Sequence, residues 1–397
     1  MTGPGRRHLI GALVGIVLVG VTAVVPIVVS GGYCARTVPL QVTSSTEKVT
    51  LITEFARQYN DSHRAVGGVC GEVQVRGISS GAMKNAIAAG TERTDVWLPT
   101  SSMWLRLLEH DKRGGLFVRD PAPRSVVTST LVIAMPQDTA NALRDRGTPL
   151  RRWADVLSLG QQGWAAYGKP EWGDFVLGRD NAETSTSGLS ATVATYVAAK
   201  GGDITQASLD DPQVVGFVHG IESSVARYGI EAVAFMEEIY AAEQAAGTAP
   251  HRPYIDALVV QEQMVYMYNR GAPGGDPKSF DRGARPTEPL QVVYPEDGTL
   301  QLDHPFVVMS SAAADQRAVA EDFRTFLADG PRQQRFADFG FRLPGDATHP
   351  TEQIVQTLGE PSTQNLHLVP IPDGNLLAQM LSRWDTVRRK ARVLLVL

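Results

Sequence analysis

The stretch "GEVQVRGISSGAMKNAIAAG", residues 71–90, contains the unit that decides the fold. The run 71–76 is typical of a strand, and the run 81–90 is typical of a helix. Between them lie Ser79 and Ser80, on a polar turn that also fits the G-x-S-x-G pattern of serine hydrolases. Ser79 therefore has two interpretations: a nucleophile, or part of a turn that binds a ligand.

The same strand–turn–helix unit recurs on both sides of this stretch. Residues 39–44, "PLQVTS", and 94–100, "TDVWLPT", are further strands, and each is followed by a helix pattern. A second series begins at the apolar strand 129–136 and contains the helix 186–201. Strands that alternate with helices of this length are typical of parallel α/β sheets.

The order of these units predicts two α/β lobes, each a mainly parallel sheet flanked by helices. We expect the first lobe to span 38–130 and to resume at 298–346, after a second lobe at 131–297. The two crossings, near 129–136 and 292–302, would form a hinge. Ligands of open α/β sheets bind beyond the carboxyl ends of the strands, which here is the cleft between the lobes.

The composition is that of a globular protein of two or three domains. The chain has 397 residues, of which 43% are hydrophobic and 20% are charged. Its net charge of −5 argues against nucleic acid as a partner, because a nucleic-acid-binding protein needs a clustered basic face. A small anion is not excluded, since local backbone dipoles bind anions whatever the net charge. No cofactor is predicted.

The N-terminus has the pattern of a membrane anchor. Arg6 and Arg7 precede residues 9–30, an apolar run without charged side chains that is long enough to span a bilayer. Basic residues before the span place the N-terminus in the cytoplasm and the remainder outside the membrane. We therefore expect residues 1–37 to form a cytoplasmic tip and a single transmembrane helix. A cleaved signal peptide is the alternative.

Two cysteines, Cys34 and Cys70, would both lie outside the membrane. An even count in an oxidising compartment predicts one disulfide between them, and two free thiols are the alternative. The sequence contains no C-x-x-C motif and no His/Cys cluster, so no metal site is predicted.

Paired hydroxyl side chains follow strands in both lobes. A helix N-terminus offers free backbone N–H groups and a partial positive charge, so such turns are natural sites for a polar or anionic ligand. Helix capping is the structural alternative. The candidate ligand-binding residues are Ser44, Ser45, Ser79, Ser80, Ser101, Ser102, Ser185, Thr186, Ser187 and, after a helix near the expected cleft, Tyr228.

The recurrence of these turns favours ligand binding over catalysis by Ser79. A serine hydrolase needs one activated serine with a histidine and an acid. The candidate bases lie in no evident motif, so no catalytic residue is predicted and a serine hydrolase remains an alternative. These histidines are His110, His219, His251, His304, His349 and His367.

Several segments of the chain are distinctive in combination. They are "SSTEK" (44–48), "GISSGA" (77–82), "DVWLPTSS" (95–102), "YGKPEWGDFVLG" (167–178), "STSGLSATVA" (185–194), "YNRG" (268–271), "YPEDGTL" (294–300) and "FADFGFR" (336–342). Together they resemble bacterial extracellular solute-binding proteins of the type II periplasmic-binding fold. More narrowly, they resemble the actinobacterial group in which such a region precedes a von Willebrand factor A domain.

The resemblance implies a two-lobed clamshell related to molybdate- and sulfate-binding proteins. Such a protein has no enzymatic activity, closes on a small polar or anionic ligand, and has an ABC-type permease as a possible partner. An adhesion or sensing module whose cleft binds nothing is the alternative. The resemblance carries over Ser44, Ser45, Ser79, Ser80, Ser185, Thr186 and Ser187 as cleft residues.

Residues 347–397 are expected to form a C-terminal tail. Its last residues, "ARVLLVL" (391–397), are typical of a buried strand of a parallel sheet. In the resembling group this strand begins the von Willebrand factor A domain. We expect that domain to be truncated here, before its D-x-S-x-S metal motif.

Overall fold

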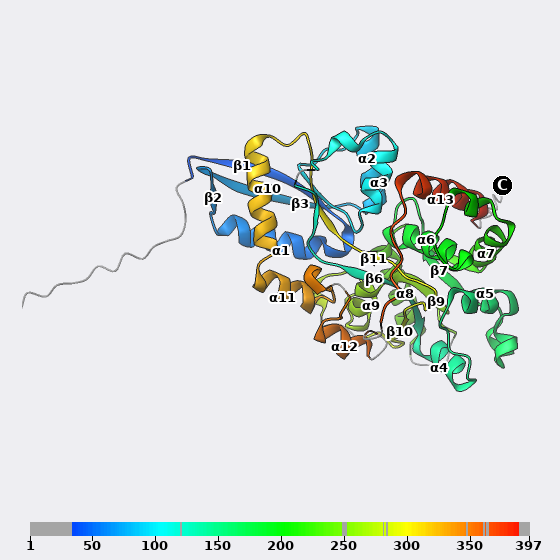
Figure 1. The fold of residues 1–397 in the computed structure, drawn as a ribbon. Coiled ribbons are helices and arrows are strands. Elements are labelled where there is room, and N and C mark those ends of the chain that lie inside the picture. The colour runs from blue at the N-terminus through cyan, green and yellow to red at the C-terminus, as the bar shows by residue number, and fades with distance from the viewer. Residues whose placement is uncertain are drawn as a thin grey trace, which may run out of the picture.

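Two sheets, each covered by helices, make up the two lobes of the molecule (Figure 1). The structure is a computed structural model. It describes residues 34–119, 121–247, 252–280, 282, 285–346, 348–359, 362 and 365–388.

The first lobe is built on a six-stranded mixed sheet. Parallel pairing is confined to its centre, where β1 lies between β3 and β4. The outer pairs β2–β3, β4–β12 and β12–β5 are antiparallel. The strand order is β2 (Ala65–Val66), β3 (Val69–Gly77), β1 (Arg36–Ser44), β4 (Val96–Leu98), β12 (Pro305–Val308) and β5 (Arg124–Ser125).

The second lobe also has a mixed sheet, but its described strands other than β6 all run in one direction, so the predicted mainly parallel arrangement is confirmed apart from β6. β9, β7 and β8 run parallel, whereas β6 is antiparallel to β9, β10 and β11. β6 is the strand by which the chain enters this lobe, and because β9, β10 and β11 are each antiparallel to it, β10 and β11 run in the same direction as β9. The order is β10 (Leu290–Val293), β6 (Ser129–Pro136), β9 (Ala257–Gln261), β7 (Leu177–Asp180) and β8 (Val225–Gly229), with β11 (Gln301–Leu302) also on β6.

Helices cover both sheets and enclose two hydrophobic clusters. The first lobe carries α1 (Val49–Asp61), α2 (Ser80–Ala89), α3 (Met103–His110), α10 (Ala314–Leu327) and α11 (Gly330–Asp338). The second carries α4 (Gln137–Asp145), α5 (Trp153–Gln162), α6 (Thr186–Lys200), α7 (Pro212–Ser223), α8 (Ala232–Ala246) and α9 (Glu262–Asn269). Side chains alternate along a strand, so β6 contributes Val132 and Ala134 to one cluster and Leu131 and Ile133 to the other.

A buried ion pair lies where the chain passes between the lobes. Arg342 Nε and Nη2 donate to Glu262 at 2.5 and 2.8 Å, and both side chains are fully buried. The same carboxylate accepts from the backbone N–H of Thr130, in β6, and from the hydroxyl of Tyr294. The ion pair therefore links β6 and the segment after β10, where the chain crosses between the lobes, to the segment that follows α11.

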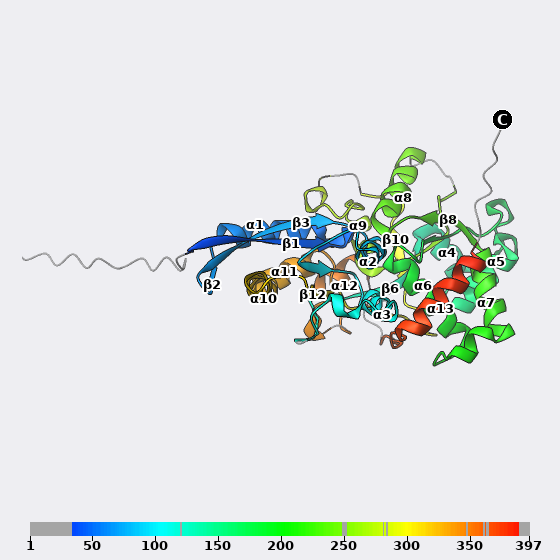
Figure 2. The ribbon, with the colours of Figure 1, turned by 90° about the horizontal axis from the view of Figure 1, so that it is seen from above.

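Residues 347–397, which the sequence predicts to be a C-terminal tail, contain two helices. α12 (Glu352–Leu358) packs on α9 and α11, and α13 (Gly374–Val387) packs on both α3 and α6, so it contacts both lobes (Figure 2). On the second lobe, Trp384 is fully buried and donates from Nε1 to Glu222 at 3.2 Å. Residues 391–397, the expected von Willebrand strand, lie outside the described residues.

The predicted disulfide is confirmed, and it ties the start of β1 to β3. Cys34 and Cys70 are bonded, with their Cα atoms 5.4 Å apart. The predicted transmembrane helix at 9–30 lies outside the described residues. Within the part of the chain that the structure describes, no helix is long and apolar enough to cross a membrane.

Candidate ligand-binding cleft

A small pocket lies between the two lobes, and the space between its lining atoms, including the part open to solvent, is about 250 Å³. It is placed at the carboxyl ends of β1, β3 and β4 in the first lobe and of β7, β8 and β9 in the second. The N-termini of α2, α6 and α8 meet there. The lining residues are Thr46, Glu47, Ser79, Ser80 and Thr100 from the first lobe, and Ser185, Thr186, Ser187, Glu231, Ala232 and Gln261 from the second.

Five of the residues named from the sequence meet in this pocket. They are Ser79, Ser80, Ser185, Thr186 and Ser187. The Ser80 hydroxyl accepts from the backbone N–H of Thr100 at 3.0 Å. The Ser185 hydroxyl donates to Asp180 at 2.8 Å. Burial raises the pKa of Asp180 to about 7, although the bond from Ser185 opposes that shift.

The other sequence candidates have structural contacts outside the pocket lining. Ser44 donates to the carbonyl of Ser45. Ser101 accepts from the backbone N–H of Met103, and Ser102 is the N-cap of α3, so this pair lies at a helix end. The Tyr228 hydroxyl donates to Glu222 at 2.9 Å, beneath α13.

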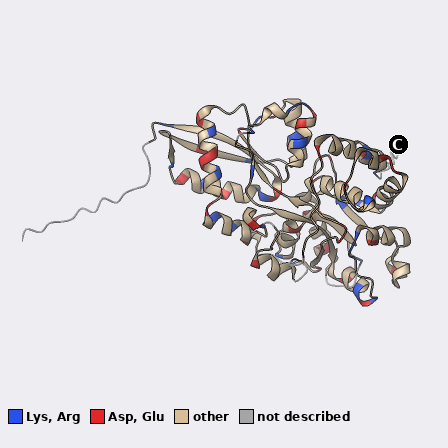
Figure 3. Ribbon diagram, viewed as in Figure 1, with Lys and Arg blue, Asp and Glu red and all other residues tan. Residues whose placement is uncertain are grey.

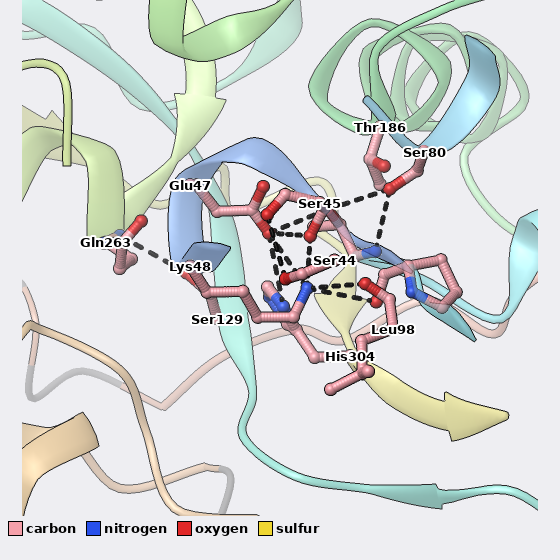
Figure 4. Close-up of polar contacts among 12 residues, drawn as sticks. Ser44, Ser45, Glu47, Lys48, Ser80, Leu98, Ser129, Thr186, Gln263 and His304 are labelled. Atoms are coloured by element: carbon pink, nitrogen blue, oxygen red, sulfur yellow. Dashed lines mark hydrogen bonds and ion pairs between the residues drawn. The ribbon is translucent and has the colours of Figure 1, made fainter. Parts of the chain in front are cut away.

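The floor of the pocket is a buried cluster of charged and polar groups around Glu47 (Figure 4). Glu47 Oε1 accepts from the hydroxyls of Ser45 and Thr100 at 2.6 and 2.9 Å, and lies 3.4 Å from Lys48 Nζ. Lys48 Nζ also donates to the Ser45 hydroxyl and to the carbonyl of Leu98. His304 Nδ1 is 3.5 Å from the same carboxylate oxygen.

Burial and mutual charge set the protonation of this cluster. Burial acts to raise the pKa of Glu47, but Lys48, His304 and the Ser45 hydroxyl outweigh it and lower that pKa to about 2. Burial lowers the pKa of Lys48, opposed by Glu47. Burial, with Lys48 nearby, lowers the pKa of His304 to about 3. At neutral pH the cluster therefore holds an ionised Glu47 and an uncharged His304.

Three hydrogen bonds join the lobes directly across the cleft. Thr46 Oγ1 donates to Glu231 at 2.6 Å, the Gly81 N–H donates to the carbonyl of Thr184 at 3.0 Å, and Trp104 Nε1 donates to Thr186 Oγ1 at 2.8 Å. The lobes are therefore closed on each other in this structure.

Gly81 permits this close approach. A Cβ at this position would lie 2.3 Å from the carbonyl oxygen of Glu183 and 2.6 Å from the Cα of Thr184, both backbone atoms of the other lobe. Only a residue without a Cβ fits at this contact.

Sequence reasoning missed Thr46, Glu47, Thr100, Glu231 and Gln261. Thr100 and Gln261 stand at strand ends, where the rule that found the serines applies equally. Glu47 and Lys48 follow the paired serines at the end of β1, with Thr46 between, and charged residues at such a turn are usually solvated. The available signal for Glu47 was its position in "SSTEK", three residues beyond the end of β1.

The sequence of residues 40–342 matches the family described as bacterial extracellular solute-binding protein. The chain belongs to this family. The proteins of this family and the structures similar to this solute-binding protein are binding proteins rather than enzymes. No curated protein matches the sequence.

Several solved structures share the fold of this solute-binding protein at low identity. The ferric binding protein from Campylobacter jejuni has a TM-score of 0.56 at 11% identity, covering 87% of this chain and 98% of that one. A periplasmic thiamin binding protein has a TM-score of 0.54 at 10%, covering 90% and 100%. The sulfate-binding protein SubI from Mycobacterium tuberculosis has a TM-score of 0.50 at 14%, covering 89% and 98%.

A change at Gly81 should hold the lobes of the solute-binding protein apart. In Gly81→Ala, the new Cβ displaces the backbone at 183–184, so the closed state becomes less populated. Energy transfer between dyes at exposed positions 91 and 203, one in each lobe, should fall. Gly216→Ala, which adds a Cβ in open space on α7, is the control. Unchanged transfer in Gly81→Ala would contradict the closed-lobe contact.

The His304 ring should make stability depend on pH. Its pKa is about 3 when folded and about 6.5 when unfolded, so the unfolded chain binds more protons as pH falls below 6.5. Wild type should therefore lose about 2 kcal/mol through this residue between pH 7 and pH 5, at about 1.4 kcal/mol per pH unit.

The measurement is urea unfolding of wild type and His304→Gln at both pH values. The contribution of Asp180, whose raised pKa acts in the opposite direction, is common to both proteins and cancels in the difference. An identical pH dependence in the two proteins would show that His304 is not held uncharged.

Proposed function

We propose that this solute-binding protein captures a small polar ligand between its two lobes, outside the cytoplasm. The observation that carries the proposal is the pocket itself. Hydroxyl groups and helix N-termini from both lobes converge on one small space at the carboxyl ends of the strands. Such a site offers hydrogen bonds in every direction but room for only a small molecule.

The helix N-termini and the buried carboxylate favour ligands of opposite charge. The partial positive charges at the starts of α2 and α6 favour an anionic group, as the sequence suggests. The ionised Glu47 on the pocket floor disfavours one. Ligands named for proteins of similar fold include ferric iron, thiamin and sulfate, so the fold itself sets no preference.

The setting in the cell is also part of the proposal. The apolar run 9–30 supports a membrane anchor, with the lobes extracytoplasmic. An ABC-type permease is the proposed partner, because a similar structure is described as an ABC transporter. Basic and acidic residues are interspersed over both lobes (Figure 3). The narrower relationship to chains that precede a von Willebrand factor A domain rests on the sequence segments alone.

Two other functions have less support. A serine hydrolase would need a histidine bonded to Ser79, and no histidine among the described residues makes that contact. An adhesion or sensing module with a non-binding cleft is compatible with the direct hydrogen bonds between the lobes. Ligand binding distinguishes it from the proposed function.

Ligand binding should raise the thermal stability of the full-length chain in mild detergent. The panel is sulfate, molybdate, simple sugars, amino acids and short peptides. A ligand present at 100 times its dissociation constant stabilises the folded state by roughly 2.7 kcal/mol. The shift should disappear in the triple variant Ser79→Ala, Ser80→Ala, Ser187→Ala and persist in Ser223→Ala with Ser311→Ala, two exposed serines.

The absence of a shift with every class would contradict the proposed function and favour the adhesion or sensing module. A ligand-induced rise in thermal stability that persists in the triple variant would show that the ligand binds outside this pocket.

A further inference from the structure

One oxygen of the pocket-floor carboxylate is available to a ligand. All the contacts of Glu47 with other residues go to Oε1, which faces Ser45, Lys48, Thr100 and His304. Oε2 makes no hydrogen bond or ion pair with another described residue, and Figure 4 shows it turned away from those contacts. Glu47 lines the pocket and is only 6% exposed, so Oε2 is an acceptor with little access to water.

The charged side chains that line the pocket are both acidic. Besides Glu47, Glu231 caps its own helix, accepting from the N–H groups of Val233 and Ala234, and accepts from Thr46 across the cleft. Lys48 lies behind the pocket wall, fully buried, with its protons directed to Ser45, Glu47 and backbone carbonyls. Among the described residues, no basic side chain therefore lines the pocket for an anionic ligand to pair with.

Acceptor groups continue along the pocket wall. Gln261, which is 2% exposed, lines the pocket, and its Oε1 is buried without a hydrogen-bond partner. A buried acceptor without a partner is costly, and a donor from a ligand would satisfy it. Together with Glu47 Oε2, it makes the floor of the pocket a site for a hydrogen-bond donor.

The start of α2 and the first turn of α6 offer hydrogen-bond donors and a partial positive charge, in contrast to the acceptors on the pocket floor. Ser79 is the N-cap of α2 and makes no side-chain capping bond, and Ser187 lies in the first turn of α6. Both hydroxyls line the pocket without a described partner. Hydroxyl donors and the positive ends of two helices suit a carboxylate, sulfonate or phosphonate group.

We propose that the ligand is a small zwitterion whose protonated amine binds Glu47 Oε2 and whose anionic group lies against Ser79 and Ser187. The inference rests on the solute-binding function proposed above and names the class of its ligand. A simple oxyanion would place its charge near Glu47 Oε2 without a basic side chain among the described lining residues to pair with it. A metal ion would lack ligands, since the described residues contain no group of three or more His, Cys, Asp or Glu side chains that could hold one.

The test compares ligands of matched length on the full-length chain by titration calorimetry. The zwitterions are glycine, β-alanine and 4-aminobutyrate. Each is paired with the amine that lacks the carboxylate and the acid that lacks the amine, and sulfate is included. We expect at least one zwitterion to bind, with each of its two partial analogues weaker by roughly tenfold or more, because each loses one charge-assisted contact.

The variant Glu47→Gln tests the position of the amine. It should lower the affinity for the zwitterion by roughly tenfold or more, and the affinity for the acid analogue should stay equal or rise. Glu72→Gln, at an exposed residue of β3, should change neither. The comparison of ligands on wild type needs no variant, so it decides the question even if Glu47→Gln fails to fold.

The possible outcomes distinguish the proposal of a zwitterionic ligand from the proposed solute-binding function. Binding of sulfate or of the acid analogues at least as tight as that of every zwitterion would overturn the zwitterion and leave the solute-binding function standing. Equal binding of zwitterion and amine would overturn the anionic subsite. No binding by any compound, with no thermal shift in the wider panel, would overturn both.

Discussion

The site depends on keeping one carboxylate ionised where water has little access. Placing Glu47 in the protein interior would be costly without partners, and its hydrogen bonds and ion pair come from the turn after β1 and the segment after β4. The uncharged ring of His304, the residue before β12, lies 3.5 Å from the same oxygen. Four groups gather on Oε1, so the side chain has one orientation. His304 has a backbone φ of +37°, which is uncommon for a residue other than glycine, and its ring still lies in this cluster. The cluster thus fixes both the charge and the direction of Oε2.

Closure of the lobes completes the site. The first lobe supplies the carboxylate and the start of α2, and the second supplies Ser187 and Gln261. Hydrogen bonds from Thr46, Gly81 and Trp104 hold the lobes together, and α13 contacts both of them. A ligand that bridges the cleft would therefore add to contacts already present, and opening of the cleft would break these three hydrogen bonds. The buried pair of Glu262 and Arg342 lies beside the strands about which such opening would occur.

The sequence predicted the two-lobed fold more completely than it predicted the residues that line the pocket. Alternating strand and helix patterns led to two α/β lobes, because the period of apolar residues reports local structure directly. The patterns did not show strand direction at the crossings, which depends on long-range pairing, so the reversed direction of β6 and β12 was not predicted. The hydroxyl turns were found at strand ends, yet Ser101 and Ser102 lie at the start of α3, outside the pocket. Glu47 was missed because only tertiary packing distinguishes a buried carboxylate from a solvated one.

The central claim is that the cleft binds a solute through Glu47 and the starts of two helices. The most direct measurement is a crystal structure of the full-length chain with the tightest-binding compound. We expect a ligand nitrogen within about 3 Å of Glu47 Oε2 and an anionic group against the first turns of α2 and α6. A ligand bound outside the cleft, or an anionic group placed on Glu47, would contradict it.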